Sequence, residues 1–187
     1  MQKMKATLIL ENGMTFAGRS IGSGEERICE MVFNTSMTGY QEILTDPSYA
    51  GQGVVMSYPL IGNYGVNHED NESRRPWVEA LVVRHLSPQG SNFRCEDTLD
   101  SYLKQYDITG IQGVDTRALT KILRSQGSMN GMLTCAEHFN VAEVMERLRS
   151  YEVKDTIRRV TRTEPEVFDA YGEETHLVAV MDYGVKQ

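Results

Sequence analysis

The chain has 187 residues, with 19 basic and 26 acidic side chains and a formal net charge of −7. This length is enough for one sizeable domain that folds without disulfides. The acidic excess argues against a nucleic-acid partner, because binding to the phosphate backbone needs a basic surface. The longest apolar runs, at residues 54–56 and 80–83, are far shorter than the roughly 20 residues that span a bilayer. We therefore expect no membrane partner.

The cysteines and the N-terminus favour a cytoplasmic location. Cys29, Cys95 and Cys135 are odd in number and far apart in the sequence. This pattern is typical of reduced thiols, and not of a disulfide framework or a Cys-x-x-Cys metal site. The first residues lead directly into the strand-like run Ala6–Leu10, with no apolar signal core.

The first half of the sequence predicts β-strands. Residues 7–10 and 15–18 flank Asn12-Gly13, a pair that favours a two-residue type I′ hairpin turn because both residues tolerate positive φ. We expect further strands at residues 28–34, 54–57 and 80–84. In the first of these, Cys29, Met31 and Phe33 should share one face and Ile28, Glu30, Val32 and Asn34 the other. Residues 68–76 are polar and end in a proline, which predicts an exposed loop.

The second half predicts three helices. An apolar stripe of Leu99, Tyr102, Leu103 and Tyr106 indicates the first. Asp115 is expected to be the N-cap of the second, which buries Ala118, Leu119, Ile122 and Leu123 and ends before Gly127. Asn140 is expected to be the N-cap of the third, with Glu143 three residues later and with Val141, Val144, Met145 and Leu148 facing inward.

The composition of the sequence changes after residue 151. Residues 152–174 are charged and irregular, as in a connector. The apolar run that follows and enters Asp182-Tyr183-Gly184 suits the first strand of a parallel sheet, buried on both faces. Alone, such a strand leaves backbone groups unpaired, so Leu177–Met181 must dock on the first domain, pair with another copy or remain disordered.

Sequence patterns alone identify no catalytic group. The chain has no Gly-x-x-x-x-Gly-Lys-Ser/Thr phosphate loop, no Gly-x-Ser-x-Gly elbow and no His-Glu-x-x-His zinc helix. His68 stands beside Glu69 and Asp70, but solvated carboxylates in a polar loop explain this cluster better than a metal site does. No histidine is close in sequence to a thiol that it would have to activate. We therefore predict no catalytic residue and no metal ligand.

Five segments match one enzyme family in order and spacing. They lie at residues 35–42 (Thr-Ser-Met-Thr-Gly-Tyr-Gln-Glu), 44–49 (Leu-Thr-Asp-Pro-Ser-Tyr), 58–65, 110–120 and 127–131. In these segments the chain resembles the N-terminal domain of the small, glutamine-hydrolysing subunit of carbamoyl phosphate synthetase. The resemblance implies a mixed α+β fold, in which a swivelling β/β/α-type domain is followed by a connector and by the first strand of an α/β class I amidotransferase domain that is otherwise missing. The implied boundaries are residues 1–151 for the N-terminal domain, 152–175 for the connector and 176–187 for the start of the truncated amidotransferase domain.

The resemblance also implies a function. The family makes carbamoyl phosphate from bicarbonate, glutamine and two ATP for arginine and pyrimidine biosynthesis, and its small subunit releases ammonia through a cysteine thioester aided by histidine and glutamate. That cysteine is expected in the missing half, so Cys29, Cys95 and Cys135 receive no catalytic role. The implied partners are the large synthetase subunit, the chain's own amidotransferase domain and glutamine. ATP and metal ions belong to the large subunit, so no cofactor is assigned to this chain.

Ser48 is the one substrate-binding residue that the resemblance implies. We expect residues 40–44 to form a short helix whose start near Thr38-Gly39 is capped by a hydroxyl and which Asp46-Pro47-Ser48 ends, so that Ser48 is presented on a rigid turn. The serine at this position of the family helps to hold glutamine, and a hydroxyl that both donates and accepts suits an amino acid. Alternatively, Ser48 only caps the turn through its own backbone.

Other positions leave two interpretations open. Residues 58–65 predict a tight bend that glycines permit. Asp115 and Arg117 either pair with the large subunit or act as an N-cap and a solvated basic residue.

A free-standing interaction or regulatory module without catalysis is the alternative function, and a cysteine elbow downstream in the complete reading frame would decide against it.

Overall fold

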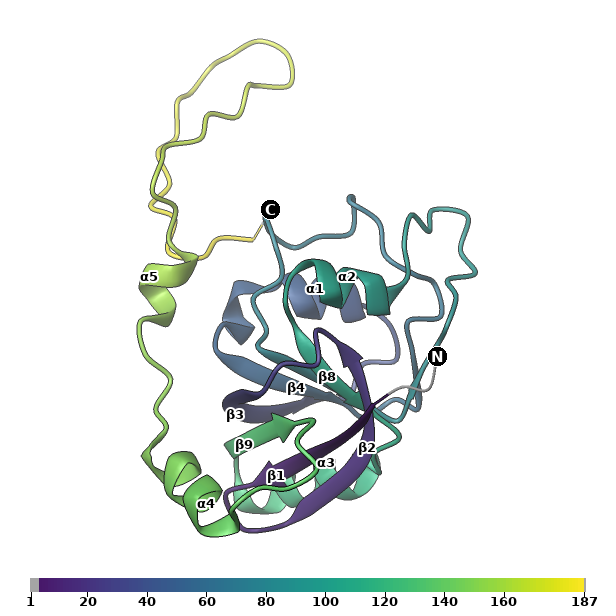
Figure 1. Ribbon diagram of the computed structural model, residues 1–187. Coiled ribbons are helices and arrows are strands. Elements are labelled where there is room, and N and C mark those ends of the chain that lie inside the picture. Colours follow the sequence, from purple (N-terminus) through teal and green to yellow (C-terminus); the bar gives the residue numbers. More distant parts are fainter. Residues whose placement is uncertain (1–3, 187) are drawn as a thin grey trace.

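The computed structural model describes residues 4–186, and within them seven strands close into a barrel (Figure 1). The order of strands around the barrel is β1-β2-β8-β6-β4-β3-β9. Their bounds are β1 Lys5–Leu10, β2 Thr15–Gly22, β3 Arg27–Asn34, β4 Gln52–Met56, β6 Ala80–Val83, β8 Thr109–Gln112 and β9 Met129–Thr134. A separate two-stranded parallel sheet pairs β5 (Leu60–Ile61) with β7 (His85–Leu86). The expected mixture of strands and helices is confirmed, and the closed barrel is a feature that the sequence did not predict.

Strand direction gives the barrel two different ends. β3, β4, β6 and β8 run parallel to one another, whereas β1, β2 and β9 join them through antiparallel pairs. The carboxyl ends of the four parallel strands therefore meet at one edge and their amino ends at the other. The connections that leave these two edges carry most of the segments that the sequence analysis selected.

The barrel wall separates two apolar clusters. Cys29, Met31 and Val55 belong to one cluster, which Leu119 and Leu123 join from a helix. Val32, Val54 and Met56 belong to the other, which packs against helices on the opposite side of the wall. The predicted alternation of faces along residues 28–34 is thus confirmed. Gly53 has no room for a side chain, because a Cβ there would lie 2.6 Å from Cys29 Sγ and 2.8 Å from Met31 Sδ.

The β1–β2 hairpin forms where the sequence predicts it, but its turn is of a different type. Only Gly13 has positive φ (84°), and its N–H donates to the Leu10 carbonyl. Leu10 N–H in turn donates to the Met14 carbonyl. The loop therefore has three residues with glycine in the left-handed position, and the predicted two-residue type I′ turn is wrong.

The predicted helices of the second half are confirmed, with some differences at their ends. Asp115 and Asn140 are the N-caps of α3 and α4, as expected. Val141 is 61 % exposed and Tyr106 is 38 % exposed, so both were wrongly assigned to inward faces. Each lies at a helix terminus, where the apolar side of the helix extends beyond its contact with the rest of the fold. The bounds are α2 Leu99–Gln105, α3 Thr116–Gln126 and α4 Val141–Ser150.

The chain beyond α4 runs along the outside of the molecule to α5 (Thr156–Val160), a helix that the sequence did not predict (Figure 1). Val160 is buried against Trp77 and Ala50, which fastens α5 to the first domain. The chain then projects away and returns, so that its last described residues lie close to the barrel. Within the described range, residues 177–181 form no strand and are exposed. None of the helices of residues 4–186 is long and apolar enough to cross a membrane.

Helix α1 (Tyr40–Thr45) begins where the sequence predicts, with a cap from a distant residue. Its N-cap is Gly39, with φ 80°, and no side chain of the preceding residues caps it. Instead the Tyr64 hydroxyl accepts hydrogen bonds from Gly39 N–H (2.8 Å) and Tyr40 N–H (3.1 Å), while the rings of Tyr40 and Tyr64 stack 4.1 Å apart. The expected start near Thr38-Gly39 and its cap by a hydroxyl are therefore confirmed, but the hydroxyl comes from the distant Tyr64 and not from a side chain at the helix start.

This geometry predicts that Tyr64→Phe destabilises the fold by about 1–2 kcal/mol, since the ring stack remains but two N–H groups at the helix start lose their acceptor. Urea unfolding measures the change. Tyr106→Phe is the matched control, because no hydrogen bond of the Tyr106 hydroxyl is found among the described residues. Equal stability losses for the two variants would contradict the role of the Tyr64 hydroxyl.

Candidate functional site

Helix α1 is held in place by buried polar side chains. The Gln41 side chain is fully buried; its amide donates to the Asn67 carbonyl and to Asn71 Oδ1, and its oxygen accepts from Asn67 N–H at 3.0 Å. The Thr45 hydroxyl donates to the Gln41 carbonyl (2.9 Å) and accepts from Glu72 N–H (2.8 Å). A buried network in which each group has its partner fixes one geometry. It joins α1 to the loop at residues 67–77.

That loop is therefore less exposed than its composition predicts. Ser73 and Pro76 are buried. Ser73 Oγ donates to the Thr45 carbonyl (2.6 Å) and accepts from Trp77 Nε1 (2.8 Å). The prediction of an exposed loop at residues 68–76 is thus wrong for Ser73 and Pro76, whereas Arg74 and Arg75 are exposed as expected. Through Ser73 the loop anchors α1 to Trp77.

The turn after α1 presents Ser48 at the surface. Asp46 ends the helix, and the short 3₁₀ helix Pro47–Tyr49 follows. Asp46 Oδ1 accepts a hydrogen bond from Ser48 N–H at 2.9 Å, so the carboxylate of Asp46 caps this turn. The predicted end of the helix and the rigid turn are confirmed. Ser48 is exposed and remains able to contact a ligand.

The returning end of the chain lies against this turn. Asp182 Oδ1 accepts from the N–H groups of Gly184 and Val185, both at 2.8 Å, and Asp182 Oδ2 accepts from Arg162 Nε at 2.8 Å. Gly184 has φ 106°, and a Cβ there would lie 2.8 Å from Val160 Cγ2 and 3.2 Å from Pro47 Cβ. Only glycine permits this close approach and this φ.

An ion pair connects the chain end to the turn. Lys186 Nζ lies 2.7 Å from Asp46 Oδ2 and 3.9 Å from Glu72 Oε2. Burial alone would raise the pKa of Asp46, but the hydrogen bonds from Lys186 and Ser48 outweigh it and hold this pKa below its ordinary value. The hydrogen bond to Asp46 raises the pKa of Lys186. Each group therefore favours the charged form of the other at neutral pH.

A hollow of about 440 Å³ lies beside Ser48, between the barrel, α5 and the chain end. Its polar lining includes Glu30 and Gln52, whose side chains form a hydrogen bond of 2.7 Å. Its apolar lining comes from Pro47, Ala50, Val153, Ile157 and Val160, and Tyr183 and Gly184 border it from the chain end. A hydroxyl on a fixed turn beside such a hollow can orient a small polar substrate, but it cannot by itself act as an activated nucleophile.

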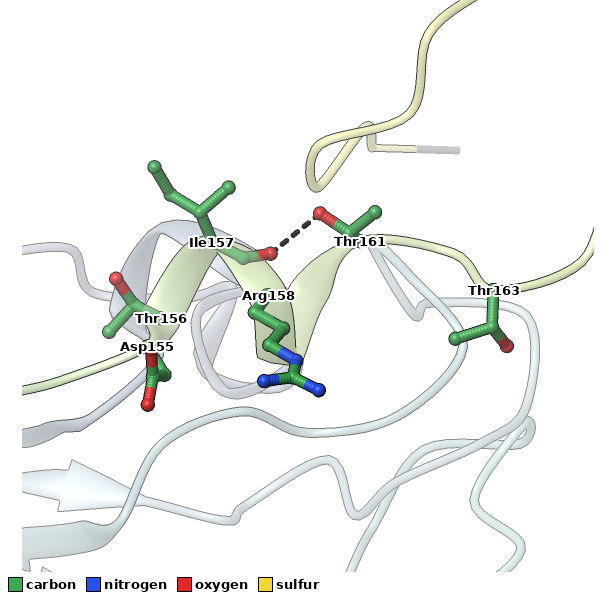
Figure 2. A pocket seen from close by; sticks show the side chains of 6 residues that line it. All are labelled: Asp155, Thr156, Ile157, Arg158, Thr161 and Thr163. Carbon is green, nitrogen blue, oxygen red and sulfur yellow. Dashed lines mark hydrogen bonds between the residues drawn. The ribbon is translucent and has the colours of Figure 1, made fainter.

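A second hollow of about 580 Å³ lies beside α5 and carries no comparable site. Figure 2 shows that its lining side chains point in different directions: Ile157 and Thr161 to one side, Asp155 and Arg158 to the other. The Thr161 hydroxyl is occupied by a hydrogen bond of 2.7 Å to the Ile157 carbonyl. These groups do not converge on a common point where a ligand would bind.

The cysteines and histidines do not form a catalytic arrangement. Cys29 is buried, and this burial raises the pKa of its thiol. In residues 4–186 all three cysteines are unpaired and no thiol forms a hydrogen bond with a histidine. His68 Nδ1 contacts Glu96, whereas Asp70 pairs with Arg94, so the residues of the His68 cluster do not converge. The described part of the chain contains no group of three or more potential metal ligands.

Sequence reasoning found some of these residues and missed others. Asp115 Oδ1 caps α3 through Ala118 N–H at 3.0 Å, and Arg117 is exposed. The spacing of Asp46 two residues before Ser48 is typical of a side chain that caps its own turn, and this signal was overlooked. No local signal identifies Lys186, because its contact with Asp46 joins residues far apart in the sequence.

The described residues form a seven-stranded barrel that presents an exposed serine, Ser48, on a capped turn beside a hollow. Residues 8–133 match the family model described as carbamoyl-phosphate synthase small chain, CPSase domain. The chain belongs to the carbamoyl phosphate synthase small chain family. The predicted resemblance is confirmed.

Individual relatives are also small chains of carbamoyl phosphate synthase. The carbamoyl phosphate synthase small chain of Clostridium perfringens is 48 % identical over 184 residues, which cover 98 % of this chain and 52 % of that protein. The small chain of Listeria monocytogenes is 48 % identical over 97 % of this chain and 49 % of its own length. The pyrimidine-specific small chain of Bacillus subtilis is 44 % identical over 98 % and 50 %. The chain thus spans about half the length of the curated relatives it matches.

The ion pair predicts a defined titration of Asp46. Because the pKa of this carboxyl is lowered in the folded state, the attachment of the chain end is complete above the ordinary pKa of aspartate, about 3.9, and is lost as the pH falls through the lower pKa of folded Asp46. Lys186→Met should move the titration midpoint of Asp46 upward, as followed by carboxyl-carbon NMR. Lys154→Met, which breaks the exposed pair with Glu152, should leave it in place. An unchanged midpoint in Lys186→Met would contradict the pairing.

Proposed function

We propose that this chain is the N-terminal part of the glutamine-hydrolysing small chain of a carbamoyl phosphate synthetase, and that its Ser48 helps to hold glutamine. The observation that carries the proposal is the exposed Ser48, fixed on a turn beside a hollow in a chain 48 % identical to a carbamoyl phosphate synthase small chain. The small chain supplies ammonia from glutamine to a large chain, which makes carbamoyl phosphate for arginine and pyrimidine biosynthesis in the cytoplasm. The large chain holds ATP and metal ions.

The remaining half of the relatives' length supplies the chemistry. In this proposal residues 1–151 are a domain of the swivelling β/β/α type and 152–175 are its connector. Residues 176–187 begin a class I amidotransferase domain that carries the cysteine nucleophile. Support comes from the exposed apolar run near the chain end, in which Leu177, Val178, Val180 and Met181 are 68–90 % exposed. A strand that is buried on both faces of a parallel sheet has this composition.

Ser48 acts by positioning. Its backbone N–H and its hydroxyl both donate to the Asp46 carboxylate, so the exposed hydroxyl oxygen is left to accept a hydrogen bond from an N–H group of glutamine. The Asp46–Lys186 ion pair keeps the turn and the chain end together, so that the hydroxyl faces the domain that follows. The hydroxyl makes no covalent bond, and the thioester forms on a cysteine of that domain.

The isolated 187-residue chain should release no ammonia from glutamine, because none of its thiols has an adjacent base and removing a nucleophile costs orders of magnitude in rate. A coupled assay for free ammonia, read against a buffer blank, measures this. Ammonia release that thiol alkylation abolishes would overturn the assignment of catalysis to another domain.

Ser48→Ala in the full small chain, assembled with the large chain, should lower kcat/KM for glutamine roughly tenfold, about 1–1.5 kcal/mol for one neutral hydrogen bond. Synthesis from added ammonium should hardly change, because free ammonia bypasses the glutamine site. Parallel assays with glutamine and with ammonium measure both.

Ser101→Ala, an exposed serine on α2, is the matched control and should leave both activities unchanged. A role limited to the turn predicts a different result for Ser48→Ala: a lower melting temperature, with unchanged kinetic constants where the protein stays folded. Unchanged use of glutamine would remove Ser48 from the site.

A further inference from the structure

The family segments divide between the two edges of the barrel. Ser48 and its hollow lie near Gln52, at the amino end of β4. The segments that follow the carboxyl ends of β3, β4, β6 and β8 leave from the opposite edge. They include residues 35–39, which contain the Thr-Ser-Met-Thr-Gly motif, and residues 57–60. The proposed role of Ser48 does not account for this second edge.

Exposed apolar side chains accompany that edge. Met37 is 68 % exposed, Tyr58 37 % and Leu60 43 %. Phe93 follows β7 in the loop at residues 87–97 and is 95 % exposed. Within residues 4–160 it is the most exposed large apolar side chain. Aromatic side chains, phenylalanine among them, are enriched in the cores of protein–protein interfaces.

Hydrogen bonds and ion pairs hold the loop on both sides of Phe93. On one side, the N–H and the hydroxyl of Ser91 both donate to the Asn63 carbonyl at 2.9 Å. Next to Phe93, Asn92 Oδ1 accepts from Arg94 N–H at 2.9 Å and the Asn92 carbonyl accepts from Cys95 N–H at 3.0 Å.

On the other side, the Arg94 guanidinium contacts the Asp70 carboxylate at 3.0 Å and that of Glu69 at 3.3 Å. Glu96 N–H donates to the Val66 carbonyl at 2.9 Å. Phe93 therefore stands on a fixed backbone and loses little conformational entropy when it enters a partner's pocket.

The charge around Phe93 limits the kind of partner. Four carboxylates, of Glu69, Asp70, Glu96 and Asp97, surround the loop. Arg94 pairs with the first two, and His68 contacts Glu96. This acidic collar repels nucleic acid and also a second copy of a chain whose net charge is −7. A protruding side chain cannot enclose a small ligand, which needs a concave site. The collar complements a protein surface with an apolar pocket and basic residues at its rim.

We propose that Phe93, within its acidic collar, is the anchor by which this small chain docks on the large chain of the synthetase, where it enters an apolar pocket with a basic rim. This inference rests on the proposed function, because that function supplies the large chain as partner. Met37, Tyr58 and Leu60 extend the contact along the same edge. Docking through this edge leaves Ser48, at the opposite edge, free to face the amidotransferase domain.

Phe93→Ala in the full small chain tests the anchor. Buried aromatic anchors dominate interface energetics, so the dissociation constant for the large chain, measured by biolayer interferometry, should rise roughly tenfold or more. Phe168→Ala removes a phenylalanine that is 73 % exposed on the chain end and should change it less than about twofold. Melting temperature and the glutaminase activity of the separate small chain should be unchanged in both variants.

Glu96→Gln tests the collar. The variant should slow association with the large chain and flatten its dependence on ionic strength, because surface charge acts mainly on the rate of encounter. Glu146→Gln, on the exposed side of α4, is the matched control and should leave both unchanged. Equal salt dependence in Glu96→Gln and wild type would count against the basic rim.

The outcomes test the docking surface and the proposed function separately. Wild-type binding that Phe93→Ala leaves intact overturns the docking surface while the proposed function stands. No binding of the wild-type small chain to the large chain overturns both. A homodimer of the small chain that Phe93→Ala dissociates, seen by analytical ultracentrifugation, overturns the proposal in favour of self-association.

Discussion

The rest of the structure depends on the buried hydrogen bonds that hold α1. A helix of six residues is too short to be stable alone in water, so its position is set by contacts with distant segments. Gln41 and Thr45 supply these contacts from within the helix, and Tyr64 supplies the oxygen at its start. The Ser48 turn follows directly from the last residue of α1. The position of Ser48, the substrate-binding side chain that we propose, is therefore set by groups from distant parts of the chain.

The closed barrel separates the two tasks that we assign to this chain. Closure leaves no free strand edge in the barrel that could pair with another chain, so contacts with partners fall to the connections at its two ends. At one end, the Asp46–Lys186 ion pair and the close approach of Gly184 bring the chain end to Ser48. At the other, the fixed loop of Phe93 projects from the surface. Substrate positioning and docking thus use opposite edges of one rigid wall.

Much of the fold is local in origin and was predicted from sequence. The apolar stripes and N-caps of α3 and α4 lie within a few residues of one another, and the alternation along β3 follows from its side chains alone. The failures involve groups far apart in the chain. The type I′ turn is an exception, since a turn of either length suits Asn12-Gly13. The cap of α1 comes from Tyr64, and the loop at residues 68–76 is drawn inward by Thr45 and Trp77.

The candidate site likewise has some features that local sequence predicts and others that depend on residues far apart in the chain. Ser48 came from the family resemblance and its rigid turn from Asp46-Pro47, which are local signals. Lys186 and the hollow bordered by α5 arise only when the chain end returns to the first domain. A double-mutant cycle between Thr45→Val and Ser48→Ala tests most directly whether the α1 network positions Ser48. With kcat/KM for glutamine measured in the assembled synthetase, each single change should lower this value, and the double variant should be little worse than Ser48→Ala alone. Fully additive losses would show that Thr45 and Ser48 act independently and would contradict this account.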